Sequence, residues 1–258
     1  DLKTMPTWLK LVNVHVIKSA KSNTPSTGSG ATAGTDANNT TWGQDIMRYG
    51  VSIKGDVMRI DYHLVYAAQS GNYIPQAVGK VKTDGNMMHG EVGYSVPDFM
   101  NSRVSFTYHM DTGKKSATVT DKTEAYDPYF YDRHANSGLM DIVDWGNLTY
   151  MSLGYTLTPM DQMDIGVQYH MFTRTEKESG NTAGDNAKGL TGLTSATTDK
   201  TKDDLGTELD VYATKRYDSG FSIQARYGMF MPGKAIKLNN ADKADAISQV
   251  FLEAKMNF

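Results

Sequence analysis

The chain of 258 residues contains no cysteine, which excludes disulfides and thiolate metal sites. It has no run of about 18 apolar residues, so a transmembrane helix is excluded as well. The formal net charge is -3 and no polybasic patch stands out, which argues against nucleic-acid binding. The first residues lack the basic start and apolar core of a signal peptide, so either that segment was removed or the chain is a fragment. We expect one domain over residues 1–258, with no cofactor and no metal.

What the sequence does contain is alternation of apolar and polar residues with a period of two, the pattern of a β-strand. Between Ser102 and Asp111, for example, Phe106 and Tyr108 alternate with Thr107 and His109. A membrane-spanning strand needs only about 9–11 residues, of which alternate ones face lipid, so a mean hydropathy of -0.48 is compatible with it. About ten such segments are predicted: Trp8–Lys18, Asp45–Lys54, Val57–Ala68, Asn86–Val96, Ser102–Asp111, Thr149–Leu157, Met163–Arg174, Glu208–Thr214, Phe221–Met229 and Ala246–Phe258.

The end of the chain is the most informative of these segments. Val250, Leu252 and Met256 form one apolar face, and the segment ends on the aromatic Phe258. Bacterial outer-membrane barrels commonly finish this way, and their assembly machinery reads the last strand. The alternative is the edge strand of a soluble sandwich.

The connections between the predicted strands alternate in length. The short ones are Gly55–Asp56, Pro97–Asn101, Thr158–Asp161 and Asp218–Gly220, and the long ones are Ser19–Gln44, Gln69–Gly85, Thr112–Gly146, Glu176–Asp204 and Pro232–Asp245. Short periplasmic turns and long extracellular loops are typical of an all-β, antiparallel transmembrane β-barrel. We therefore expect an outer-membrane location, contacts with lipopolysaccharide, phospholipid and the barrel-assembly machinery, and passage of small polar solutes. The oligomeric state stays open.

The polar faces of the predicted strands carry charges of both signs, as a water-filled lumen would. The candidate lumen-lining residues are Arg48, Arg59, Asp61, His63, Glu91, Arg103, His109, Asp111, Asp164, His170, Arg174, Glu208, Asp210, Arg226, Glu253 and Lys255.

Three His–carboxylate spacings raise the question of catalysis: Asp61 with His63, His109 with Asp111, and Asp132 with His134. The first two pairs have i, i+2 spacing, so both side chains share one strand face. No nucleophile with an orienting base can be assigned to them from the sequence. We predict ion pairs in the lumen and no enzyme activity.

The long segment Tyr126–Leu148 differs from the other loops because it is rich in aromatic and aliphatic side chains. A solvated loop gains nothing from such side chains, so this one should pack against the barrel. We expect it to fold over or into the lumen mouth as a constriction; the alternative is an extracellular cap. The constriction residues would be Asp127, Asp132, Arg133, His134 and Trp145.

Six short motifs stand out along the second half of the chain: Tyr126–Phe130, His134, Gly138–Asp141, Trp145–Leu148, Gly206–Val211 and Tyr227–Gly233. In this order they resemble the alginate-export family of outer-membrane barrels. The resemblance implies a porin-like channel for polar or anionic solutes. Family members have about eighteen strands, so this chain is either a shortened relative or the C-terminal part of a larger barrel. Passage of alginate, a polyanion, would require an excess of positive charge in the lumen, and the inward-facing residues show no such excess.

A passive channel is therefore the function that we expect. Two alternatives remain open at this stage: an outer-membrane barrel with a catalytic or adhesive extracellular site, and a structural barrel whose lumen is plugged.

Overall fold

The computed structural model describes residues 7–22, 43–74, 81–113, 115, 122–128, 137–143, 145–177, 196–198, 202–238 and 245–256. All regular structure in these residues is β-strand. The strands are β1 Leu9–Ser22, β2 Gly43–Val57, β3 Ile60–Ile74, β4 Val81–Thr83, β5 Asn86–Val96, β6 Ser102–Asp111, β7 Lys122–Thr123, β8 Leu148–Met160, β9 Met163–Arg174, β10 Ala196–Thr198, β11 Asp204–Arg216, β12 Phe221–Pro232, β13 Ile236–Leu238 and β14 Ile247–Met256. The described residues include no helix that could cross a membrane.

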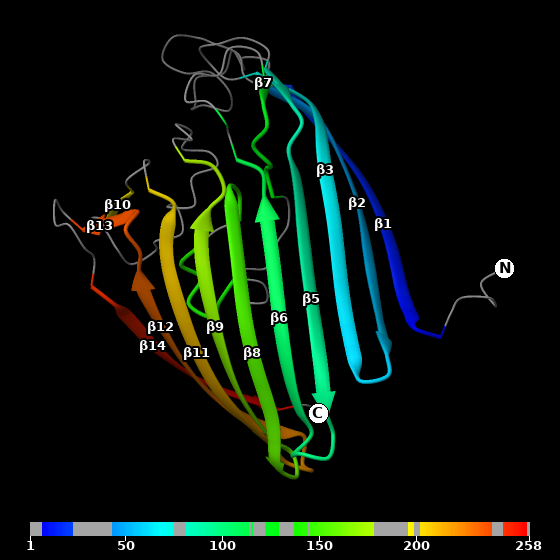
Figure 1. Ribbon diagram of the computed structural model, residues 1–258, viewed down its shortest axis with the longest axis vertical. Helices are drawn as coiled ribbons and strands as arrows, with labels where there is room; N and C mark the ends of the chain where they lie inside the picture. The colour runs from blue at the N-terminus through cyan, green and yellow to red at the C-terminus, as the bar shows by residue number, and fades with distance from the viewer. Residues whose placement is uncertain are drawn as a thin grey trace.

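Ten long strands form one sheet in the order β1-β2-β3-β5-β6-β8-β9-β11-β12-β14, and each pairs with the next in the antiparallel direction. Neighbours in the sheet are therefore neighbours along the chain, as in an up-and-down barrel. Within the described residues, β1 does not pair with β14, so the sheet is open between these edges (Figure 1). The predicted all-β antiparallel fold with about ten strands is confirmed.

The short pieces lie in the long connections. β4 pairs with the end of β3 in the antiparallel direction, and β7 pairs with β4 in the parallel direction. β10 and β13 pair with each other as a separate two-stranded sheet. The sequence prediction missed all four because two or three residues are too few to show alternation.

The strand ends that border the short connections and those that border the long ones lie at opposite ends of the sheet, as predicted (Figure 1). One predicted turn is wrong: β2 continues through Gly55 and Asp56 to Val57, and the turn is formed by Met58 and Arg59. Met58 has a φ of 56° there. Gly55 is instead a close-packing position, because a Cβ on it would lie 2.0 Å from the backbone oxygen of Trp8.

Candidate functional site

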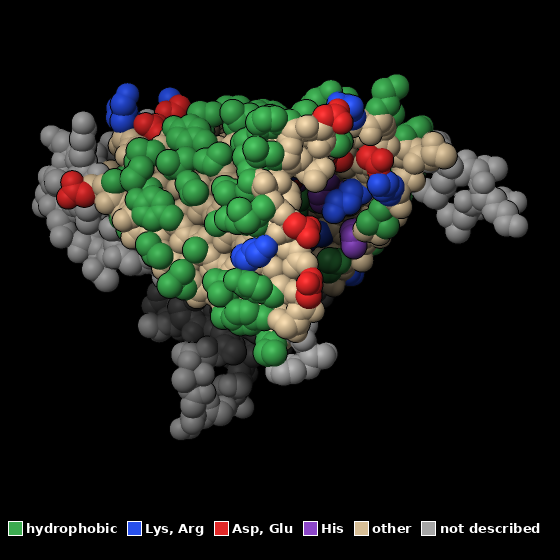
Figure 2. Space-filling model, turned by 90° about the horizontal axis from the view of Figure 1, so that it is seen from below, with side chains coloured by type: hydrophobic (Ala, Val, Ile, Leu, Met, Phe, Trp, Pro, Cys, Tyr) green, Lys and Arg blue, Asp and Glu red, His purple; other side chains and the backbone are tan. Residues whose placement is uncertain are grey.

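The two faces of the sheet reverse the usual pattern of a soluble protein, in which polar side chains are exposed and apolar ones are buried. Apolar side chains on one face, such as Phe106 and Leu153, are about half exposed. On the other face His109 and Glu208 are fully buried. We call these the apolar face and the polar face. Figure 2, which views the molecule from the end with the short turns, shows hydrophobic side chains over much of the outside, and a hollow in which His side chains lie with some of the charged ones. An apolar face of this kind suits contact with lipid.

The segment that precedes β8 lies on the polar face. Three of its backbone N–H groups donate to carboxylates of the sheet: Leu139 to Asp210 Oδ2 at 3.0 Å, Met140 to Glu208 Oε1 at 2.9 Å, and Gly146 to Asp111 Oδ2 at 2.7 Å. We call residues 137–143 and 145–147 the inset segment. These three hydrogen bonds fix the segment against β6 and β11.

The inset segment also brings its own apolar core. Met140 lies over Gly228 of β12, where a Cβ would be 2.6 Å from the Met140 Cγ. Only a glycine leaves room for this approach. The core cluster around it comprises Met140, Ile142, Val143, Leu148, Tyr150, Phe172, Leu205, Phe230, Ala235 and Ile236. Because these side chains come from the inset segment, from β8, β9, β11 and β12, and from residues 235–236, the segment is held from several sides.

A ring stack anchors the other end of the inset segment. The indole of Trp145 lies on the imidazole of His109, with the ring centroids 3.9 Å apart and the planes 29° from parallel. His109 Nε2 is 3.0 Å from Asp111 Oδ2, the same atom that receives the Gly146 N–H. Asp111 therefore joins the sheet, the histidine and the segment.

Residues 122–128 contact the polar face nearer to β2 and β3. Arg48 donates to Asp127 Oδ2 at 2.7 Å, and Gln69 bonds both the Ala125 carbonyl and the Asp127 N–H. Burial, with a smaller contribution from Asp111, raises the pKa of the nearby Tyr126 to about 12. The phenol is therefore neutral at physiological pH.

The part of the polar face nearest the short turns is not covered by these segments. There Arg103 of β6 reaches across β5 to Asp61 of β3, donating to its two oxygens at 2.9 and 2.5 Å, and it also donates to Glu91 at 2.7 Å. Gly93 of β5 makes this possible, because a Cβ there would lie 2.3 Å from the guanidinium. Gly166 plays the same part under the ring of Tyr212.

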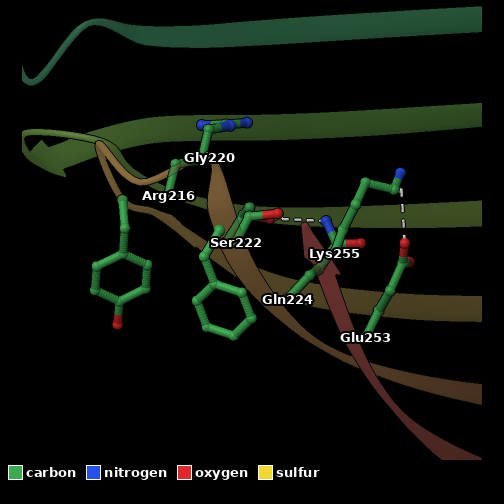
Figure 3. Close-up of a pocket in the computed structure, with 9 residues that line it drawn as sticks. Arg216, Gly220, Ser222, Gln224, Glu253 and Lys255 are labelled. Atoms are coloured by element: carbon green, nitrogen blue, oxygen red, sulfur yellow. Dashed lines mark hydrogen bonds and ion pairs between the residues drawn. The ribbon is translucent and has the colours of Figure 1, made fainter. Parts of the chain in front are cut away.

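Farther round the sheet, two adjoining hollows lie on the polar face between β8 and β14, each of about 350 Å³. They share the lining residues Thr214, Arg216 and Gln224 (Figure 3 shows the hollow nearer β14). We call the two together the lower hollow.

Comparison of the sequence with known families matches residues 15–249 to the alginate-export family. The chain belongs to the alginate-export family. Among solved structures, the crystal structure of OccK11 (OpdR) from Pseudomonas aeruginosa is similar, with a TM-score of 0.43 and 10% identity over 84% of this chain and 54% of that one. The chain thus spans about half the length of that protein. None of the curated proteins compared with it matches.

Membership in the alginate-export family assigns the chain to the outer membrane. The resemblance inferred from the motifs is therefore confirmed. Two of those six motifs, Gly138–Asp141 and Trp145–Leu148, fall in the inset segment and at its junction with β8.

The structure separates the predicted site residues into two groups. His109, Asp111, His170, Arg174, Glu208, Asp210 and Arg48 are buried, and Asp61, His63, Glu91, Arg103, Asp164, Arg226, Glu253 and Lys255 are at least partly exposed on the same face. Arg59 lies elsewhere: it is in the turn between β2 and β3 and donates to Asp98 at 3.2 Å. Asp132, Arg133 and His134 lie outside the described residues.

The predicted His–carboxylate pairs differ from one another. His109 and Asp111 are in contact, as their spacing suggested. Asp61 instead bonds to Arg103, and His63 Nε2 lies 3.0 Å from Ser52 Oγ. His170 Nε2 and Asp210 Oδ2 form a further pair at 3.4 Å.

Two functional candidates were missed. His89 pairs with His109 across the strands, with ring centroids 5.6 Å apart. Arg216 ion-pairs with Asp164 in the lower hollow. Arg216 could have been found by continuing the alternation of β11 two residues beyond Thr214, where the predicted strand stopped.

Proposed function

We propose that the protein is a passive outer-membrane channel for polar solutes, with the polar face as its lumen and the inset segment as its constriction. The observation that carries this proposal is the set of three backbone N–H groups, from Leu139, Met140 and Gly146, that donate to carboxylates of the polar face. A segment bonded to that face narrows whatever space the face encloses. Asp111 is the last residue of β6, but Glu208 and Asp210 lie inside β11, whereas an extracellular cap would bond to strand ends alone.

The partly exposed charges would then filter solutes below the constriction. Arg103, Asp61 and Glu91 form one mixed cluster, and Arg226 and Glu253 form another at 3.4 Å. Charges of both signs along a pore create a local transverse field without a net preference for cations or anions. The continuous sheet supports a single domain.

Single-channel conductance in a planar bilayer tests the constriction. Deleting Ala125–Asp141 should raise conductance and weaken ion selectivity, because it removes two of the three anchoring N–H groups. Trp145→Ala should act in the same direction but more weakly, through loss of the stack on His109. Trp8→Ala, which removes a half-exposed indole at the start of β1, is the matched control. Unchanged conductance in a deletion variant that keeps its β-sheet circular dichroism would favour the cap.

One contact favours a second candidate, a hydrolase on the polar face. Ser52 and His63 lie 3.0 Å apart, the separation of a nucleophile and its base. The third member is not in place, because Asp61 is engaged by Arg103. We therefore expect the purified protein to hydrolyse no peptide, ester or phospholipid. Activity that Ser52→Ala abolishes would establish the hydrolase instead.

A further inference from the structure

The lining of the lower hollow carries as many cationic as anionic side chains: Arg216 and Lys255, with Asp164 and Glu253. Arg216 forms an ion pair with Asp164. Glu253 pairs with two cations, Lys255 Nζ at 3.6 Å (Figure 3) and Arg226, which lies outside the lining, at 3.4 Å. Pores that select anions present rings of unpaired Arg or Lys. Paired charges cancel at a distance, so this surface gives a polyanion little attraction.

Neutral hydrogen-bonding groups fill the space between the charges. The Gln224 amide donates to Thr214 Oγ1 at 2.7 Å, and Thr158 donates to Asp164 Oδ1 at 2.9 Å. Ser222 adds another hydroxyl to the lining. Hydroxyl groups both donate and accept, and the Gln amide offers one acceptor and two donors. Such a wall can exchange its own hydrogen bonds for those of a solute that carries many hydroxyls.

An aromatic rim completes the hollow at the short-turn end. Tyr217 and Phe221 both line it, and their rings stack with centroids 5.8 Å apart. Flat apolar rings beside hydroxyl and amide groups suit a ligand with an apolar face and a polar edge. A pyranose ring has this form.

We propose that the lower hollow is a binding subsite for neutral, polyhydroxylated solutes of mono- or disaccharide size. The volume of about 350 Å³ for each of its two parts is within the usual range for small-molecule sites. The proposal rests on the channel function for its biological role, but binding itself can be measured without transport. It departs from what a family named for alginate suggests, since alginate is a polyanion.

Saturation-transfer difference NMR on the detergent-folded chain tests binding directly, with maltose as the neutral probe and glucuronate as the anionic probe. We expect signals from maltose that disappear in the double variant Thr214→Val, Gln224→Leu, which keeps side-chain volume and removes hydrogen bonds. Gln249→Leu, on the polar face of β14 but outside the lining, should leave them unchanged. Signals from glucuronate alone, or from neither sugar, would overturn the proposal.

Liposome swelling tests the charge argument. The parent protein should admit maltose at least as fast as glucuronate. Asp164→Asn frees Arg216 from its partner and should raise the glucuronate-to-maltose rate ratio several-fold, whereas Asp161→Asn, in the adjacent turn, should not. A parent that prefers glucuronate, or an unchanged ratio in Asp164→Asn, contradicts the proposal. If no solute swells the liposomes while the maltose signals are present, the channel function fails and the subsite stands.

Discussion

An arginine on the apolar face should destabilise the protein far more than one on the polar face. Phe106 is the fifth residue of the ten in β6, and its cross-strand neighbours Val92 and Leu153 are exposed apolar residues like itself. Its side chain therefore projects from the middle of a wide apolar band. An Arg at the bilayer midplane costs about 2–4 kcal/mol, which corresponds to an unfolding equilibrium changed by about 30-fold to about 900-fold. We expect Phe106→Arg to lose stability in this range.

The assay is a urea titration of folding into lipid vesicles, followed by tryptophan fluorescence. Gln168→Arg is the control, because Gln168 lies on the polar face of β9 and pairs with Asp210 across the strands. A guanidinium at position 168 would have the Asp210 carboxylate beside it and would displace no lipid. The loss of stability should therefore be much smaller than in Phe106→Arg. Equal losses for the two variants would refute the assignment of the faces.

Three further outcomes follow from the same structure. Gly228→Ala should force Met140 off the sheet and alter single-channel conductance, and adding Met140→Ala to it should restore the parent value; a variant that conducts like the parent would show that the contact is not part of the constriction. The buried Tyr126, whose pKa is raised to about 12, stays neutral in the folded state while the unfolded phenol ionises near 10, so about 2–3 kcal/mol of stability present below pH 10 should be lost as the pH rises to 12. Tyr126→Phe should abolish this part of the alkaline unfolding profile measured by circular dichroism, and identical profiles would contradict it. Protease added to intact cells should cut within Ser19–Gln44 and spare Pro97–Asn101, since the long connections are expected outside; the reverse pattern would invert the topology.

The strands could be predicted because lipid imposes a simple rule on the sequence. Where the alternation is uninterrupted, the predicted bounds are those of the structure, as for Asn86–Val96 and Ser102–Asp111. Where a residue pair favours a turn but the strand continues through it, the prediction fails. The sequence Gly55–Asp56 favours a turn, yet Gly55 is used for close packing and Met58 takes the positive φ instead.

The site could be predicted only in part, because its contacts cross the sheet. The bond between His109 and Asp111 follows from their spacing, but the clamp of Arg103 on Asp61 joins residues 42 positions apart across an intervening strand. The sequence also could not show that Ser105 is tightly packed, with its Oγ 2.6 Å from the place of a Gly154 Cβ. An Arg at Ser105 would therefore meet steric crowding, although Ser105 lies on the polar face.

The glycines beneath the polar side chains have a consequence for how the proposed lumen can evolve. Gly93 and Gly166 let Arg103 and Tyr212 lie flat along the sheet instead of projecting from it. Replacing either glycine by alanine adds one methyl group, but the displaced side chain is several times larger and must swing inward. Single substitutions on the polar face can thus narrow the proposed lumen in coarse steps. The apolar face, the strand register and the lipid contacts would stay as they are.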